Sequence, residues 1–184
     1  AIAHVMVSFG FEGDKYVTFS IETRKERGEE YSSIKGFFKQ YELIYVVGDE
    51  RDLIRVRTDY RNPREDIYLY RIKIDREKAR KFFVEYITQI NHMKQKPVWY
   101  NTLTTNCTTN IVMHTRAFSD NIKYNWRILL SGYAPLYAYE MGFLNTGIPF
   151  ETLKSLSYIN HRAHAIGNDP DFSRKIREGL PLKW

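Results

Sequence analysis

The segment HVMVSFGFEGDKYVTFSIETR, residues 4–24, determines the type of fold that we expect. Apolar and polar residues alternate over residues 3–9 and again over 15–22, which is the two-residue period of a strand with one buried face. Between these runs, residues 10–14 (Gly-Phe-Glu-Gly-Asp) have the composition of a tight turn. The segment therefore predicts an antiparallel hairpin at the start of the chain.

Strand patterns continue in the first half of the chain. A short helical turn is expected at 34–38, and Gly48-Asp49-Glu50 is expected to form a second hairpin turn. Three further strands are predicted, at 42–47, 53–58 and 67–74.

Helical patterns dominate the second half. Asp75 suits the N-cap of a long helix that reaches about Gln95, because apolar residues recur there at helical spacing. Further helices are predicted from Asn106 or Cys107 onward, over 124–142 with an interruption at Pro135, and over 173–178. Strands followed by helices indicate an α+β fold, with an antiparallel sheet of about five strands and a helical half.

Length and composition limit the function classes. The 184 residues fit one domain, 1–184, and the net charge of +6 favours anionic partners without choosing among them. Nucleic acid is not expected as a partner, because no stacking motif or concentrated basic stripe is present. No apolar run approaches the roughly 20 residues of a membrane span. The chain opens already in strand pattern, so we expect its numbering to begin inside a longer precursor.

Cys107, the single cysteine, is the candidate nucleophile. At the first turn of a helix its sulfur lies near free backbone N–H groups and the positive end of the helix dipole, which favour the reactive thiolate. Asn106 is a good N-cap, and Asn106 and Thr108 are expected to support the turn whose N–H groups stabilise an oxyanion. The alternative is a small buried residue without chemistry.

His4 is the candidate base. A hairpin turn centred near Gly13 places positions 4 and 22 opposite each other, with Cβ atoms roughly 5 Å apart. Glu22 would then accept from one ring nitrogen of His4 and leave the other for the thiol. A register slip of two would put Ser20 or Arg24 in that position.

The other histidines are weaker candidates. His114 lies two helical turns from Cys107, roughly 10 Å away, so a packing role is expected. His161 and His164 have a spacing of three, but no third metal ligand is defined near them. We therefore expect neither a metal nor another cofactor.

These residues resemble a known family. An early histidine strand, a polar residue on the next strand and Asn-Cys-Thr at a helix start about a hundred residues later resemble the circularly permuted papain-like superfamily (NlpC/P60 and lecithin:retinol acyltransferase-like). More narrowly, the chain is similar to the Lnb N-terminal periplasmic domain family, a bacterial family marked by a histidine and an Asn-Cys-Thr motif. The segments that carry the resemblance are 4–11, 20–24, 41–47, 100–109 and 172–177.

The resemblance implies a permuted papain-like fold, a Cys-His pair and a periplasmic or other extracytoplasmic location. In the characterised branch, an acyl chain passes from phospholipid to the cysteine thiol and then to the N-terminal amine of a lipoprotein. That branch also has a membrane portion, so the resemblance implies membrane association through a segment absent from this chain.

Thiol-based acyl transfer is therefore the leading functional hypothesis, with phospholipid and a lipoprotein N-terminus as partners. Trp99, Tyr100 and Arg24 are the candidate substrate contacts, and the basic balance suits an anionic membrane surface. Two alternatives stay open: a cysteine peptidase or amidase that uses the same pair for hydrolysis, and a non-catalytic binding module. An apolar tunnel beside Cys107 would favour acyl transfer, and an open polar groove would favour peptide cleavage.

Overall fold

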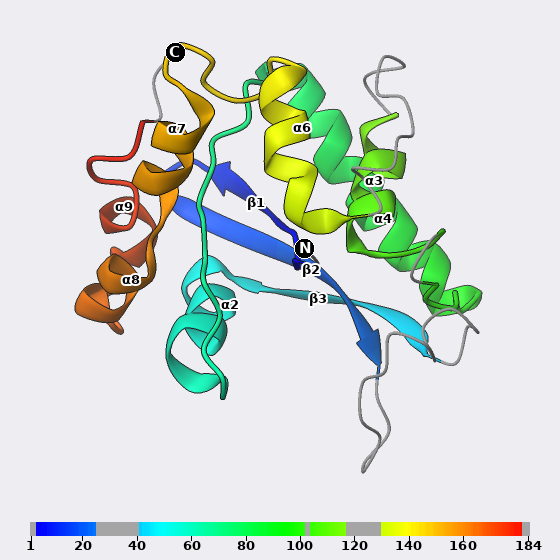
Figure 1. Cartoon of the computed structure of the whole chain (residues 1–184). Helices are drawn as coiled ribbons and strands as arrows, with labels where there is room; N and C mark the ends of the chain where they lie inside the picture. Colours follow the sequence, from blue (N-terminus) through cyan, green and yellow to red (C-terminus); the bar gives the residue numbers. More distant parts are fainter. Residues whose placement is uncertain (1–2, 25–40, 102–103, 117–129, 182–184) are drawn as a thin grey trace. The chain divides into compact units, whose positions relative to one another are not determined.

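The computed structural model describes residues 3–24, 41–101, 104–116 and 130–181, and is drawn in Figure 1. The chain divides into two compact units. Unit 1 contains residues 1–7, 19–46 and 74–134, and unit 2 contains residues 8–18, 47–73 and 135–184. All three strands contribute residues to both units, and each unit is described below by itself.

The sheet has three strands in the order β1-β2-β3. Their bounds are Met6–Phe11 for β1, Lys15–Arg24 for β2 and Glu42–Asp49 for β3. Gly13 and Asp14 form the β1–β2 turn with positive φ angles of 73° and 54°, a conformation that glycine and aspartate adopt readily. The hydroxyl oxygens of Ser8 and Thr18 lie 2.5 Å apart, so this hairpin has the register in which position 4 faces position 22. The predicted hairpin is confirmed.

The prediction of a strand at 53–58 is wrong, as is that of a hairpin turn at 48–50. The chain there forms α2 (Glu50–Arg55) and a π-helical turn (Val56–Tyr60). Asp49 caps the helix by accepting a hydrogen bond from the Arg51 N–H, and Arg55 pairs with Asp59 one turn later. A segment as short as residues 53–58 (Leu-Ile-Arg-Val-Arg-Thr) fits a helix as well as a strand, and here the cap and the ion pair favour the helix.

The prediction of a sheet strand at 67–74 is also wrong. This segment is extended, but its backbone bonds to the helical part of unit 2: Leu69 N–H donates to Ser157, and Lys73 N–H donates to Phe143. Tyr68 and Tyr158 form an isolated bridge. The described residues thus form an α+β structure with three strands in the sheet, where about five were expected.

The long helix and the helix that starts at the cysteine are confirmed as α3 (Arg76–Gln95) and α4 (Cys107–Thr115). Asp75 caps α3, as expected, by accepting from the Lys78 N–H. Pro135 lies in the first turn of a helix rather than interrupting one. The remaining helices are a 3₁₀ turn at Ser131–Tyr133, α6 (Ala134–Glu140), α7 (Phe150–Ser157), α8 (Asn160–Ile166) and α9 (Phe172–Lys175).

Two of these helices, α7 and α8, were not predicted, and α9 is shorter than the expected helix at 173–178. The helical turn expected at 34–38 and the first part of the one expected at 124–142 lie outside the described residues.

The core of unit 1 is aromatic and lies between the sheet and α3. Phe19 of β2 lies with its ring centroid 5.1 Å from that of Tyr86, and Phe82 lies 5.2 Å from the same ring. Tyr45 of β3 meets Tyr86 edge-on at 6.1 Å. Such rings fill a large volume and hold neighbouring elements in defined orientations.

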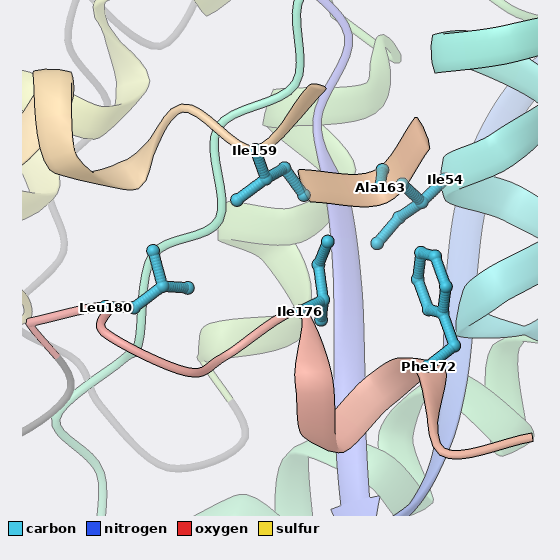
Figure 2. Packing of buried hydrophobic residues seen from close by; sticks show 6 residues of the cluster. All are labelled: Ile54, Ile159, Ala163, Phe172, Ile176 and Leu180. Atoms are coloured by element: carbon cyan, nitrogen blue, oxygen red, sulfur yellow. The ribbon is translucent and has the colours of Figure 1, made fainter. Parts of the chain in front are cut away.

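The core of unit 2 is aliphatic apart from one phenylalanine. Its buried side chains come from α2, α8, α9 and their flanking turns, and they face one another in Figure 2: Ile54, Ile159, Ala163, Phe172, Ile176 and Leu180. Together they join α2 to the C-terminal helices, which is how residues far apart in the sequence form one packed unit.

A buried ion pair also joins these parts of unit 2. Arg177 donates to both oxygens of Glu50, at 2.6 and 2.7 Å, and Glu50 is fully buried. The Arg177 guanidinium also stacks over the Tyr16 ring, 3.6 Å from its centroid. Paired bonding of this kind satisfies a carboxylate that water cannot reach.

Replacing Glu50 by Ala should lower the free energy of unfolding by about 3 kcal/mol, because the partly buried Arg177 then loses its carboxylate partner and a cavity is left at the fully buried Glu50 position. Urea unfolding measures this loss. The matched control is Glu77→Ala, which removes an exposed pair with Lys81 and should cost about 1 kcal/mol or less. Equal losses in the two variants would contradict the structural role of the Glu50–Arg177 pair.

Candidate functional site

The start of α4 is held by a reciprocal pair of hydrogen bonds. Asn106 accepts from the Thr109 N–H through its side-chain oxygen, and Thr109 accepts from the Asn106 N–H through its hydroxyl, both at 2.8 Å. This capping box is buried, and the Asn110 side chain adds a bond to the Asn106 carbonyl. Cys107 is consequently the first residue of a helix whose entry angle is fixed.

The cap leaves two backbone donors at the first turn. The Thr109 N–H bonds to the Asn106 side chain and the Asn110 N–H to the Asn106 carbonyl. Among the residues that the structure describes, the N–H groups of Cys107 and Thr108 have no such acceptor, so they are the donors of this turn that suit an incoming anion.

Cys107 is buried, with 7% of its surface exposed. Its sulfur lies 3.8 Å from the Thr108 hydroxyl, and α4 packs beside α3, which brings Tyr86 within electrostatic range of the thiol. Burial raises the pKa of the Tyr86 hydroxyl well above its ordinary value, and charge on Tyr45 and Cys107 raises it further. Tyr86 is therefore a neutral phenol next to the candidate nucleophile.

His4 is connected to Glu22 through Ser20. The Ser20 hydroxyl donates to Glu22 Oε1 at 2.7 Å and lies 2.6 Å from His4 Nε2, whereas the direct distance from His4 Nε2 to Glu22 Oε1 is 3.8 Å. Ser20 has a single proton, which it gives to Glu22, so it accepts from His4. The network thus assigns the proton of neutral His4 to Nε2 and leaves Nδ1 with the basic lone pair.

Sequence reasoning named Ser20 only as the partner in a slipped register. The structure retains the expected register and includes Ser20 as well, since a diagonal neighbour two residues along the strand is still within reach of a ring nitrogen. A serine two residues before the acid on the same strand face is the signal that could have identified it.

The three candidate substrate contacts come together at the beginning of β3. Arg24 donates to Glu42 at 2.6 Å, and Glu42 forms an antiparallel bridge with Trp99. The Tyr100 N–H donates to the Tyr41 carbonyl at 2.8 Å. Trp99, on the segment that leads to α4, is 50% exposed, and the Arg24 side chain at the end of β2 is 65% exposed, so an indole and a guanidinium are both presented to solvent.

The described contacts therefore form two groups. Cys107 lies with Thr108 at the start of α4, and His4, which precedes β1, lies with Ser20 and Glu22 of β2.

His114 has the packing role that its position suggests. It is fully buried on α4, with Nε2 2.8 Å from the Tyr45 hydroxyl, Nδ1 3.8 Å from Glu85 Oε1 and its ring 4.3 Å from that of Tyr86. Burial lowers the pKa of His114 to about 4, although Glu85 opposes this effect. His114 is therefore neutral near pH 7 and ties α4 to both β3 and α3.

The other histidines do not form a metal site in the part of the chain that the structure describes. His164 is exposed and lies 3.4 Å from Asp59, and the described residues contain no group of three or more His, Cys, Asp or Glu side chains arranged to hold an ion. Over the same residues, no helix has the length and apolar character that spanning a bilayer requires.

Loss of the cap should weaken the fold around the cysteine. Asn106→Ala should lower the free energy of unfolding by about 1–2 kcal/mol, because the buried Thr109 N–H then has no acceptor. Asn106→Ser, which restores a capping oxygen, should recover most of this loss. Urea unfolding of the two variants measures the difference, and identical losses would contradict the capping role.

His114 should make the fold sensitive to acid. An unfolded histidine binds a proton near pH 6.5 and folded His114 only near 4, so its contribution is complete above pH 6.5 and is lost as pH falls toward 4. Between pH 7 and 4, the native chain should lose about 3 kcal/mol more unfolding free energy than His114→Gln does.

Urea unfolding at several pH values tests this expectation. His92→Gln, which removes an exposed histidine from α3, is the control for loss of an imidazole. Parallel pH profiles for the native chain and His114→Gln would show that His114 is not the acid-sensitive group.

Comparison with known proteins places this chain in a family. The model of the Lnb N-terminal periplasmic domain matches residues 1–156, which include both candidate groups. Searches of curated proteins and of solved structures gave no match. The match covers most of the chain, in agreement with the resemblance carried by the histidine strand and the Asn-Cys-Thr motif. The chain therefore belongs to the Lnb N-terminal periplasmic domain family, and the domain is periplasmic.

Proposed function

We propose that this domain transfers acyl groups through a thioester on Cys107, with His4 as the base. The observation that carries the proposal is the position of Cys107 as the first residue of a helix with a buried capping box. A thiol there lies beside two backbone donors that suit an oxyanion. The His4–Ser20–Glu22 network, which leaves Nδ1 as the basic nitrogen, supports the assignment of the base.

In the first half-reaction, His4 Nδ1 takes the proton of the Cys107 thiol, and the thiolate attacks the carbonyl carbon of an ester. The N–H groups of Cys107 and Thr108 stabilise the oxyanion that forms. The carbon–oxygen bond to the alcohol then breaks, and the His4 imidazolium returns its proton to the departing oxygen. The products are a thioester on Cys107 and a free alcohol.

In the second half-reaction, an amine attacks the thioester carbonyl and loses a proton to His4. The carbon–sulfur bond breaks, the thiolate takes back a proton and an amide is released. Phospholipid is the proposed donor and a lipoprotein N-terminus the proposed acceptor, as the family resemblance implies. Arg24 and Trp99, gathered around Glu42, are proposed to meet the lipid head group.

The proposal also extends to the fold. We infer that the helix bearing Cys107 and the strands bearing His4 correspond to the nucleophile helix and histidine strand of a permuted papain-like enzyme. In that arrangement residues 1–184 act as a single domain.

Intact-mass analysis after incubation with phospholipid vesicles tests the proposal. The native chain should gain one fatty-acyl mass that hydroxylamine removes, and Cys107→Ala should gain none. His4→Gln should slow formation of the adduct about 100-fold or more, because the general base is lost. His161→Gln, an exposed histidine on α8, is the matched control and should react at the native rate.

Each outcome separates the candidate functions. An adduct that passes to an added peptide with a free N-terminal amine supports acyl transfer. An adduct lost to water at the same rate with and without the peptide indicates a hydrolase. The absence of any adduct, together with alkylation of Cys107 that is unchanged in His4→Gln, would overturn the Cys-His pair and favour a binding module.

A further inference from the structure

Helix α3 has an inner face and an outer face. Phe82, Phe83 and Tyr86 belong to the inner face, and Phe19 of the sheet lies against Phe83 and Tyr86. A solvent-facing stripe on another side of the helix has spacings of four, three, four and three residues, and all its members are exposed: Arg80, Val84, Ile87, Asn91 and Lys94.

The centre of this outer stripe is apolar. Val84 is 52% exposed and Ile87 is 38% exposed, although both could have been polar without loss to the core. Scattered apolar residues on a surface need no explanation, but two adjacent ones centred on a charged helix face form a defined contact area.

The ends of the stripe are cationic. Arg80 and Lys94 lie fourteen residues apart, which is about 21 Å along a helix, and neither forms an ion pair with the described part of the chain. The acids of α3 are directed elsewhere: Glu77 pairs with Lys81 at 2.9 Å, and Glu85 accepts from Gln89 at 2.9 Å. The five residues of the stripe therefore include a cation at each end and no carboxylate, and the exposed Glu77, three residues before Arg80, is neutralised by its pair with Lys81.

We propose that the outer stripe of α3 rests on the surface of an anionic phospholipid bilayer. Val84 and Ile87 enter the interface, while Arg80 and Lys94 extend their long side chains to lipid phosphates on either side. Positive charge at the two ends and none of the opposite sign complement the negative potential of such a surface. The inference rests on the proposed function, because the donor in that reaction is a membrane lipid.

The chain after α3 fits this orientation. Lys96 and the half-exposed Trp99 follow the helix at once, and lysine and tryptophan are residues that anchor at the lipid–water interface. Residues 96–106 then join α3 to Cys107. A helix docked on the bilayer would thus be connected to the nucleophile by a segment that also contacts the interface.

Co-sedimentation with vesicles tests the proposal. The native chain should bind vesicles of phosphatidylglycerol and phosphatidylcholine at low salt at least tenfold more tightly than vesicles of phosphatidylcholine alone, and 0.5 M salt (about a 4 Å Debye length) should weaken binding. Val84→Asp combined with Ile87→Asp, and separately Arg80→Glu combined with Lys94→Glu, should each reduce binding at least tenfold. Leu156→Asp, a site on α7 that is 47% exposed, is the control and should bind as the native chain does.

Each variant should fold as the native chain does, because all four substituted α3 positions are exposed. Circular dichroism and urea unfolding test this. Binding that survives both double variants would overturn the proposal, as would self-association of the native chain through this stripe in sedimentation velocity. Cys107→Ala should bind vesicles normally. If the native chain does not bind vesicles but is still acylated on Cys107 by detergent-dispersed lipid, this inference alone is overturned. If the chain binds vesicles normally but forms no acyl adduct, the proposed function alone is overturned.

Discussion

The ring of Tyr86 is the centre on which unit 1 is built. It is fully buried and contacts Phe19 on β2, Tyr45 on β3 and His114 on α4, while its own helix supplies Phe82. Ring contacts thereby hold each of these elements against α3, while β2 and β3 also pair with each other through their backbones. The orientation of α4, and with it the direction in which Cys107 projects, depends on this one aromatic cluster.

The parts of the fold that were predicted correctly are those specified by local sequence. The β1–β2 hairpin has both strand alternation and a turn that tolerates positive φ, and α3 has a capping aspartate and a sustained helical period. Residues 53–58 lack such signals, because a pattern as short as this one suits either a strand or a helix. Its helical state depends on Asp49, Asp59 and packing against Ile159 and Phe172.

The same distinction applies to the site. Position alone identified Asn106 as a cap and Cys107 as the first helical residue, since both follow from the order of residues along the chain. The link from His4 to Glu22 runs through the Ser20 hydroxyl, which contacts His4 diagonally across the hairpin. Only the three-dimensional geometry of the hairpin determines whether that hydroxyl lies between the imidazole and the carboxylate. The gathering of Arg24, Glu42 and Trp99 could not be predicted, because it needs pairing between segments more than fifty residues apart.

The direction of the bond from Ser20 to Glu22 has a consequence for proton transfer. Ser20 accepts from Nε2 whether His4 is neutral or doubly protonated, since Nε2 carries a proton in both states. The hydroxyl rotor and the carboxylate can therefore keep their positions while Nδ1 gains and loses a proton. In the proposed reaction, His4 would therefore take up and release a proton with little reorganisation of its surroundings, so the barrier would contain little cost for rearranging nearby dipoles.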